Sequence, residues 1–194
     1  IDANVQLHLP LSLEWLVSAN AIPIAVQESG FKRRPVYAPL QKRDLRIGNY
    51  LYLRLATPLA EGQRVEVLNP SGSLWPSQWR FEATVDPRRF SPAIHVNQVG
   101  YLPTLPKTAL VGYYLGSLGE LSVPVAGGFK LIDASGAVVF EGALTHRSDV
   151  GYTYSPAPYQ SVWEADFSSF TKPGEYRVWV PELGASWPFV IDEG

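Results

Sequence analysis

The stretch AIHVNQVGYLPTLPKTALV, residues 93–111, resembles the opening strand of a domain, yet it lies almost halfway along the chain. Gly100 and Pro103 are expected to bend the chain after this strand, and Tyr101 to anchor the bend by packing. The polar pair Asn97–Gln98 can bind backbone groups left open where the strand ends. We therefore interpret these residues as structural, and the stretch as the start of a second domain.

Short apolar alternation runs through the rest of the chain and is interrupted by 16 Gly and 17 Pro, a pattern typical of many strands and tight turns. Residues 51–55 and 65–67 are predicted to pair as one hairpin. Residues 129–132 and 138–140 are predicted to pair as another, with turn-forming residues between them. Residues 11–20 allow two interpretations equally well: a helix, or a strand that is followed by a loop.

The segment VDPRRFSPAI, residues 85–94, contains two prolines and two arginines and resembles a stiff polar connector. We place a domain boundary near residue 91, which leaves about a hundred residues and six or seven candidate strands on each side. The predicted fold class is all-β, with two tandem immunoglobulin-like β-sandwiches at residues 1–91 and 92–194.

Composition argues against several classes of function. The 194 residues include 16 basic and 18 acidic residues, and this net charge of −2 argues against a nucleic-acid partner. The best apolar run, residues 13–26, is broken by polar residues and proline, which argues against a membrane span. Cysteine is absent, and the three histidines have no partner at metal-ligand spacing. No run matches a calcium loop either, so we expect no metal and no cofactor.

Four segments carry a family resemblance: SPAIHVNQVGYLPTLPKTALV, FKLIDASGAVVFEG, WEADFSSFTKPGEYRVWV and ASWPFVI. In this order, across residues 92–191, they resemble the N-terminal immunoglobulin-like module that precedes the catalytic domain of many family 9 glycoside hydrolases. Residues 1–91 more loosely resemble the additional sandwich of some bacterial members. The resemblance implies an accessory region of a secreted, extracellular bacterial cellulase, and we expect the chain to be part of a longer protein.

The resemblance does not bring catalysis with it. A glycosidase needs two carboxyl groups that face each other across a sugar in a cleft. Catalytic domains of the family are much larger helical barrels with an Asp-Ala-Gly-Asp stretch. The nearest segment here, Asp133-Ala134-Ser135-Gly136, lacks the final Asp and is predicted to be a hairpin turn. The chain is therefore expected not to be an enzyme by itself.

Aromatic side chains suggest a carbohydrate-binding alternative. A sugar face stacked on one exposed ring contributes on the order of 1–2 kcal/mol, so a few rings give weak binding that tethering to a polymer strengthens. Trp75 lies beside a proline in a predicted loop. Trp79 has the same parity as residues 81 and 83 of a predicted strand, so it could lie on the buried face of that strand. The candidate rings for β-glucan or cellulose are Trp75, Trp79, Tyr152, Tyr154 and Tyr159.

Two further tryptophans are candidates for contact with a catalytic domain of the same polypeptide. Tyr176, Val178 and Val180 share one face of a predicted strand, so Trp179 lies on the opposite face. Trp187 has the same parity as two apolar residues that follow it. Large apolar side chains exposed together usually mark an interface.

Three functions thus compete. The favoured one is support and positioning of a catalytic domain. The second is carbohydrate binding, and the third is a protein-interaction tandem at a cell surface with no relation to sugars.

Overall fold

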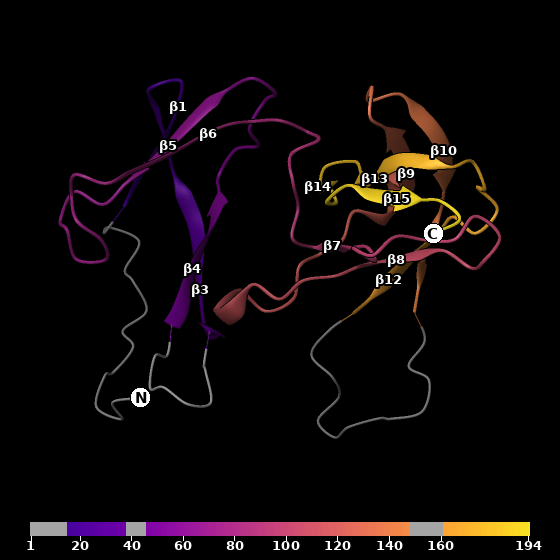
Figure 1. The fold of residues 1–194 in the computed structure, drawn as a ribbon. Coiled ribbons are helices and arrows are strands. Elements are labelled where there is room, and N and C mark those ends of the chain that lie inside the picture. Colours follow the sequence, from indigo (N-terminus) through magenta and orange to yellow (C-terminus); the bar gives the residue numbers. More distant parts are fainter. Residues whose placement is uncertain (1–14, 38–45, 148–160) are drawn as a thin grey trace. The chain divides into compact units, whose positions relative to one another are not determined.

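The computed structural model describes residues 15–37, 46–147 and 161–194. These residues form strands, turns and two short 3₁₀ helices, with no α-helix among them (Figure 1). The all-β prediction is confirmed. By its internal contacts the chain separates into a first unit, Ile1–Val85 with Leu115–Gly119, and a second unit, Asp86–Tyr114 with Glu120–Gly194.

The first unit contains a four-stranded antiparallel sheet in the order β2-β1-β5-β6 and a two-stranded ribbon, β3-β4. The strands are β1 (Leu16–Ala19), β2 (Ile22–Ile24), β3 (Val26–Tyr37), β4 (Arg46–Leu55), β5 (Arg64–Leu68) and β6 (Arg80–Thr84). In the part of this unit that the structure describes, the buried apolar side chains are Trp15, Val17 and Ala19. The described core of this unit is therefore small.

Two expectations for the first unit are decided by this pairing. The strand interpretation of residues 11–20 is confirmed at Leu16–Ala19, while residues 11–14 lie outside the described part. The hairpin of residues 51–55 with 65–67 is wrong, because β4 pairs with β3, and β5 pairs with β1 and β6. Alternation predicted the strands but not their partners, and the proline-containing connection 56–63 carries the chain from one sheet to the other.

The short 3₁₀ helix η1 (Gly116–Leu118) packs against β3 within the first unit. Backbone N–H of Phe31 donates to Ser117 Oγ at 3.1 Å. Glycine permits this close approach: a Cβ on Gly116, whose φ is +64°, would lie 2.1 Å from the carbonyl oxygen of Phe31.

The second unit is a sandwich of two antiparallel sheets, β10-β9-β13-β14 with β15 beside β13, and β11-β12-β8-β7. Its strands are β7 (Ile94–His95), β8 (Thr108–Val111), β9 (Phe129–Asp133), β10 (Val138–Gly142), β11 (Leu144–His146), β12 (Trp163–Asp166), β13 (Gly174–Val180), β14 (Gly184–Ala185) and β15 (Phe189–Ile191), and η2 (Val125–Gly127) precedes β9. The predicted hairpin of residues 129–132 with 138–140 is confirmed as β9-β10.

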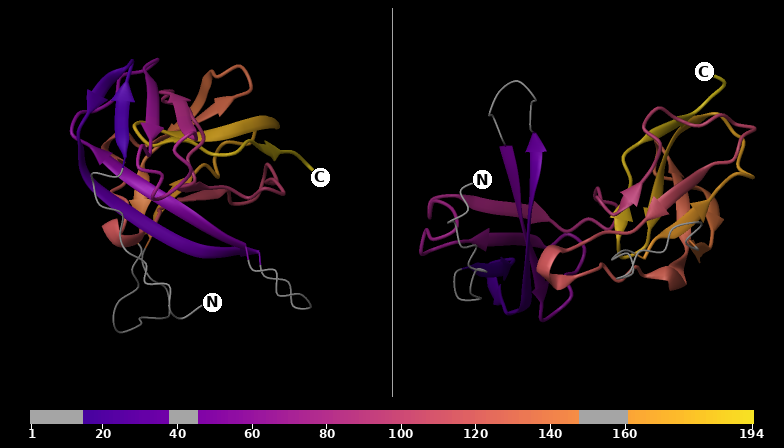
Figure 2. Two further views of the ribbon diagram at one scale, coloured as in Figure 1. Left: turned by 90° about the vertical axis from the view of Figure 1, so that its left-hand side faces the viewer. Right: turned by 90° about the horizontal axis from the view of Figure 1, so that it is seen from below.

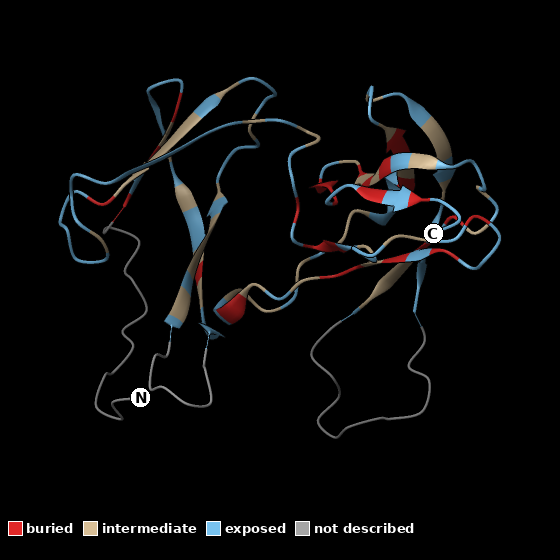
Figure 3. Cartoon of the chain, in the orientation of Figure 1, coloured by how far each residue is buried: buried red, intermediate tan, exposed pale blue. Residues whose placement is uncertain are grey.

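Buried residues of the second unit lie on strands of both sheets and on the segments next to them (Figure 3). Its buried members are Ala93, Ile94, Ala109, Val111, Phe129, Leu131, Leu144, Ala165, Phe167, Tyr176, Val178, Val180, Leu183, Phe189 and Ile191. Along β13 the buried residues alternate with half-buried or exposed ones, as period-two strand geometry requires. This architecture agrees with the predicted immunoglobulin-like sandwich for this half of the chain.

Tyr101 anchors the bend after β7 by packing, as predicted. The hydroxyl of Tyr101 accepts from backbone N–H of Asn97 at 2.9 Å and donates to Thr108 O at 3.0 Å. Its ring packs edge-on against Phe167 and Phe189, with centroids 5.1 Å away in each case. Burial raises the pKa of the Tyr101 hydroxyl, which keeps it a hydrogen-bond donor.

Residues 86–91, which the sequence suggested as a connector, are packed into the second unit. Backbone N–H of Ser91 donates to Ala185 O at 2.8 Å, and backbone N–H of Ala185 donates to Arg89 O at 2.8 Å. Ser91 itself is buried. This segment therefore lies along β14 as a structural element of the sandwich.

Candidate functional site

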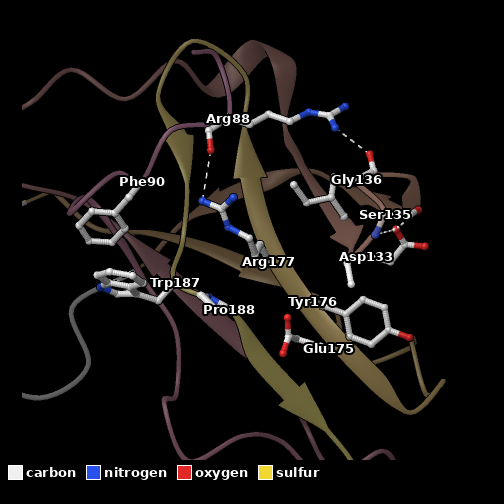
Figure 4. Close-up of a pocket in the computed structure, with 12 residues that line it drawn as sticks. Arg88, Phe90, Asp133, Ser135, Gly136, Glu175, Tyr176, Arg177, Trp187 and Pro188 are labelled. Carbon is white, nitrogen blue, oxygen red and sulfur yellow. Dashed lines mark hydrogen bonds between the residues drawn. The ribbon is translucent and has the colours of Figure 1, made fainter. Parts of the chain in front are cut away.

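A hollow of about 550 Å³ opens on the surface of the second unit (Figure 4). Its walls come from the segment before β7, the β9-β10 turn, β13 and the residues before β15. They are formed by Arg88, Phe90, Ile132, Asp133, Ala134, Ser135, Gly136, Glu175, Tyr176, Arg177, Trp187 and Pro188. Apolar and charged groups thus share one recess.

An exposed aromatic pair forms one side of the hollow. The rings of Phe90 and Trp187 are tilted by 33° with centroids 4.5 Å apart, and 41% and 56% of the two residues are exposed. Phe90 is held in place by an isolated parallel bridge to Ala185. Trp187 was predicted to contact a catalytic domain, and that contact stays a prediction. Its ring is exposed, whereas its parity partners Phe189 and Ile191 are buried.

Two arginines line the hollow in fixed positions. Arg177 donates from Nε to Ser186 O at 2.8 Å and from Nη2 to Arg88 O at 3.2 Å. Arg88 donates from Nη1 to Gly136 O at 2.7 Å, as Figure 4 shows. Because these donors already bind backbone carbonyls, both guanidinium groups are preorganised. The guanidinium of Arg88 points away from the aromatic pair toward Gly136, and that of Arg177 lies between the two (Figure 4).

Asp133, one of the acidic residues of the hollow, is held in the β9-β10 turn. Asp133 Oδ1 accepts from the backbone N–H and the hydroxyl of Ser135 at 2.9 and 2.6 Å, and from backbone N–H of Ala137 at 3.0 Å. These hydrogen bonds, that of the Ser135 hydroxyl above all, lower the pKa of Asp133. Asp133 is therefore a turn-forming residue, as the sequence predicted, and its lowered pKa is opposite to the shift that a catalytic general acid needs.

Trp179 lies next to the hollow but is engaged within its own unit. Its Nε1 donates to Pro87 O at 3.1 Å. The guanidinium of Arg88 lies 4.8 Å and Nζ of Lys130 lies 5.7 Å from the ring centroid. The prediction that it lies opposite the buried Tyr176, Val178 and Val180 is confirmed. Its half-buried ring offers less free surface than the ring of Trp187 does.

The structure separates the two tryptophans proposed for carbohydrate in the first unit. Trp75 is half-buried against Phe81, with ring centroids 5.3 Å apart in an edge-on arrangement. Trp79 is 55% exposed and Phe81 is 53% exposed. The expectation of a buried face for Trp79 is wrong, because every residue of β6 is exposed. Trp79 therefore fits a stacking platform better than Trp75.

The other candidate rings, Tyr152, Tyr154 and Tyr159, lie outside the described residues. Among the residues that are described, no group of three or more His, Cys, Asp or Glu side chains could hold a metal ion. No helix in the same ranges is long and apolar enough to cross a membrane.

A buried lysine was missed by the sequence reasoning. Lys107 is 0% exposed, and its Nζ donates to the carbonyl oxygens of Pro103, Leu105 and Ser168 at 2.6, 2.9 and 3.1 Å. Burial lowers the pKa of Lys107, and the charge of Asp166 opposes this shift. The ammonium group thus connects the loop before β8 to the turn after β12. A single lysine that follows a proline in the sequence does not predict this role.

The hollow was also only partly foreseeable. Trp187 was a candidate, and the strand parity that placed Trp179 outward also places Arg177 on that face. Phe90 and Arg88 lie in a segment that the sequence suggested as a connector, where no periodicity predicts packing. Tertiary backbone pairing with β14 brings them to the hollow.

A protein-family model, that of the cellulase N-terminal Ig-like domain, matches residues 89–185, which is half of this chain. The chain belongs to this family. Most of the hollow falls in the matched region, whereas Arg88, Trp187 and Pro188 lie just beyond its ends. The resemblance seen in the sequence is therefore confirmed for the second unit.

A curated relative of this Ig-like domain is Endoglucanase C of Cellulomonas fimi, which is 37% identical over 101 residues. The matched part is 52% of this chain and 8% of that protein. The chain thus spans a small fraction of the relative's length.

Two solved structures are also similar. A metagenome-derived glycoside hydrolase family 9 endoglucanase is 31% identical, with 50% of this chain and 17% of that chain covered and a TM-score of 0.37. A GH9 protein of Bacteroides ovatus is 28% identical, with 52% and 15% covered and a TM-score of 0.38.

Proposed function

We propose that this chain is a non-catalytic accessory region of a secreted, extracellular bacterial family 9 cellulase. In this proposal the Ig-like second unit supports and positions a catalytic domain of the same polypeptide. The family membership and the 37% identity to part of an endoglucanase support the assignment. The division into two modules is part of the same proposal, with residues 86–91 assigned to the second module instead of the first because Arg89 and Ser91 pair with Ala185.

The observation that carries the supporting role is the exposed Phe90–Trp187 pair in a hollow that also contains two fixed arginines. Interface hot spots are enriched in Trp and Arg. Large apolar side chains that are exposed together usually mark an interaction site. The arginines are already held by the sandwich, so docking on this surface loses little side-chain entropy. This hollow is complementary to a partner surface that has a projecting apolar side chain with carboxylates nearby.

A comparison of melting temperatures tests the supporting role. This chain, joined to the catalytic domain of its parent protein, is expected to melt several degrees higher than the chain alone, because docking buries apolar surface that is otherwise exposed. Differential scanning calorimetry of the joined and separate proteins provides the measurement. Equal melting of the joined and separate parts would count against the proposal.

The second candidate function is weak binding of β-glucan or cellulose by the first unit, and the exposure of Trp79 favours it. Replacing Trp79 with alanine is expected to reduce affinity about tenfold, since one stacked ring contributes on the order of 1–2 kcal/mol. Affinity electrophoresis in gels containing carboxymethyl-cellulose or β-glucan measures this change. Trp187→Ala, which removes an exposed tryptophan from the other unit, is the matched control.

The outcomes separate the two functions. Retardation that Trp79→Ala abolishes and Trp187→Ala preserves would make the first unit a binding module. Mobility that no neutral glucan alters would remove this candidate. Dimerisation of the chain, together with such unaltered mobility, would instead favour the cell-surface interaction tandem.

A further inference from the structure

The loop that connects β7 to β8 in the second unit, residues 96–107, exposes apolar side chains. Val99 is 96% exposed, the largest exposed fraction among the large hydrophobic residues in the described ranges. Leu102 and Leu105 are 41% and 52% exposed. The loop contains a single charged residue, Lys107, which is buried. The exposed part of this loop is thus uncharged and carries three accessible apolar groups.

Two polar groups hold the loop in this conformation. The hydroxyl of Tyr101 accepts from backbone N–H of Asn97 at 2.9 Å, and Nζ of Lys107 donates to Leu105 O at 2.9 Å. Backbone N–H of Val99 donates to Asn97 Oδ1 at 3.0 Å. Burying an ammonium group is costly unless it is hydrogen-bonded, so the chain uses a buried lysine to give an exposed apolar loop a defined shape. Such a loop is typical of an interaction site, because docking costs it little conformational entropy.

The end of the chain lies beside this loop. Backbone N–H of Tyr101 donates to Val190 O at 2.9 Å, and backbone N–H of Asp192 donates to Tyr101 O at 3.1 Å. The last residues therefore leave the second unit next to the loop (Figure 2, where C marks the end of the chain). The matching family model describes an N-terminal domain of cellulases, so the catalytic domain of the proposed function is expected to continue the polypeptide from here.

The loop and the hollow lie along one edge of a sheet. Both β14 and β15 pair with β13, on the side opposite β9. Parallel bridges then join Phe90 to Ala185 of β14 and Tyr101 to Ile191 of β15. A single partner that runs along this edge can therefore contact both the hollow and the loop.

We propose that Val99, Leu102 and Leu105 form a second contact area for the catalytic domain, in addition to the hollow. This inference rests on the proposed function and adds a surface to it. The loop is complementary to an apolar, uncharged patch of the partner, whereas the hollow is complementary to a surface with carboxylates. A glucan fits the loop less well, because Tyr101, its single aromatic residue, packs against two buried phenylalanine rings.

Hydroxyl-radical footprinting of the parent protein and of this chain alone tests the inference. The oxidation rates of Leu102 and Leu105 are expected to be at least about threefold lower in the parent protein, since the core of an interface excludes water. Val138 is the internal control. It is 40% exposed and lies on β10, at the opposite edge of the same sheet, so it is expected to react equally in both proteins.

The same data separate this inference from the proposed function. Unchanged oxidation of the two leucines, with reduced oxidation of Trp187, would overturn the inference and leave the supporting role intact. If neither the loop nor Trp187 is protected, the supporting role fails as well. Protection of the leucines that appears in this chain alone as its concentration is raised would show that a second copy occupies the loop, and would also overturn the inference.

Substitution of the exposed side chains gives a second readout. In the parent protein Val99→Ser/Leu105→Ser is expected to lower the unfolding temperature of the catalytic domain by at least about 3 °C. In this chain alone the same variant is expected to melt within about 2 °C of the wild type, because both side chains are already largely in water. Val125→Ser/Val138→Ser, which removes two exposed valines elsewhere in the unit, is the matched control. An equal shift of the catalytic domain in both variants, or none in the first, would overturn the inference.

Discussion

Replacing Lys107 with methionine is expected to lower the free energy of unfolding of the second unit by about 3 kcal/mol or more. Methionine fills a similar volume but cannot donate to the carbonyl oxygens of Pro103, Leu105 and Ser168, which Nζ binds at 2.6–3.1 Å. Each buried carbonyl left without a donor costs about 1–3 kcal/mol. Urea denaturation followed by tryptophan fluorescence measures the change.

Lys130→Met is the control for loss of a lysine. Lys130 Nζ pairs with Glu141 at 2.8 Å, and the Glu141 side chain is 62% exposed, so a change below about 1 kcal/mol is expected. A Lys107→Met protein as stable as this control would contradict the structural role of the buried ammonium group.

The pH dependence supplies an independent test of Lys107. Burial lowers its pKa in the folded chain, so the folded chain releases this proton at a lower pH than the unfolded chain does. The contribution of Lys107 to stability therefore rises with pH in the alkaline window that ends near the unfolded pKa of about 10.4. The difference in unfolding free energy between wild type and Lys107→Met is expected to widen across this window. A constant difference would show that Lys107 has an ordinary pKa.

Gly184→Ala is expected to destabilise the second unit by about 2–4 kcal/mol and to disturb the Phe90–Trp187 pair. Gly184 has a φ of +115°, and a Cβ there would lie 2.6 Å from the carbonyl oxygen of Arg89. That oxygen accepts from backbone N–H of Ala185 at 2.8 Å, so the clash pushes the segment of Phe90 away from β14. Urea denaturation reports the stability, and near-ultraviolet circular dichroism reports the aromatic pair.

Gly62→Ala separates backbone strain from steric clash. Gly62 also has a positive φ, +79°, but no atom lies within 4 Å of its hypothetical Cβ. It is expected to cost only about 1 kcal/mol. Equal effects of the two substitutions would mean that the contact with Arg89 contributes nothing to the position of Phe90.

The sequence predicted what depends on local pattern. The β9-β10 hairpin followed from alternation and turn residues, and the outward position of Trp179 followed from parity on β13. The packing of Tyr101 followed from an aromatic residue in a bend. These features are encoded within a few residues of one another.

Features that depend on distant partners could not be predicted in the same way. The pairing of β4 with β3 instead of β5 could not be read from alternation, because β3 is polar and basic over Lys32–Arg34 and has no apolar alternation that marks it as the partner. The burial of Lys107 depends on carbonyl oxygens supplied in part by Ser168, and the position of Phe90 depends on β14. The hollow is assembled from such long-range contacts, so only Trp187 among its aromatic side chains was a candidate from the sequence.

Calorimetry of the parent protein carrying Phe90→Ala/Trp187→Ala tests the proposed docking surface most directly. This variant is expected to lower the unfolding temperature of the catalytic domain by at least about 3 °C, because truncated aromatic anchors cost about 2–4 kcal/mol of docking energy. The matched variant Trp79→Ala/Phe81→Ala, which removes two similarly exposed rings from the first unit, is expected to leave that temperature unchanged. If the unfolding temperature of the catalytic domain is unchanged in the first variant, or shifts equally in both, the Phe90–Trp187 pair is not its docking surface.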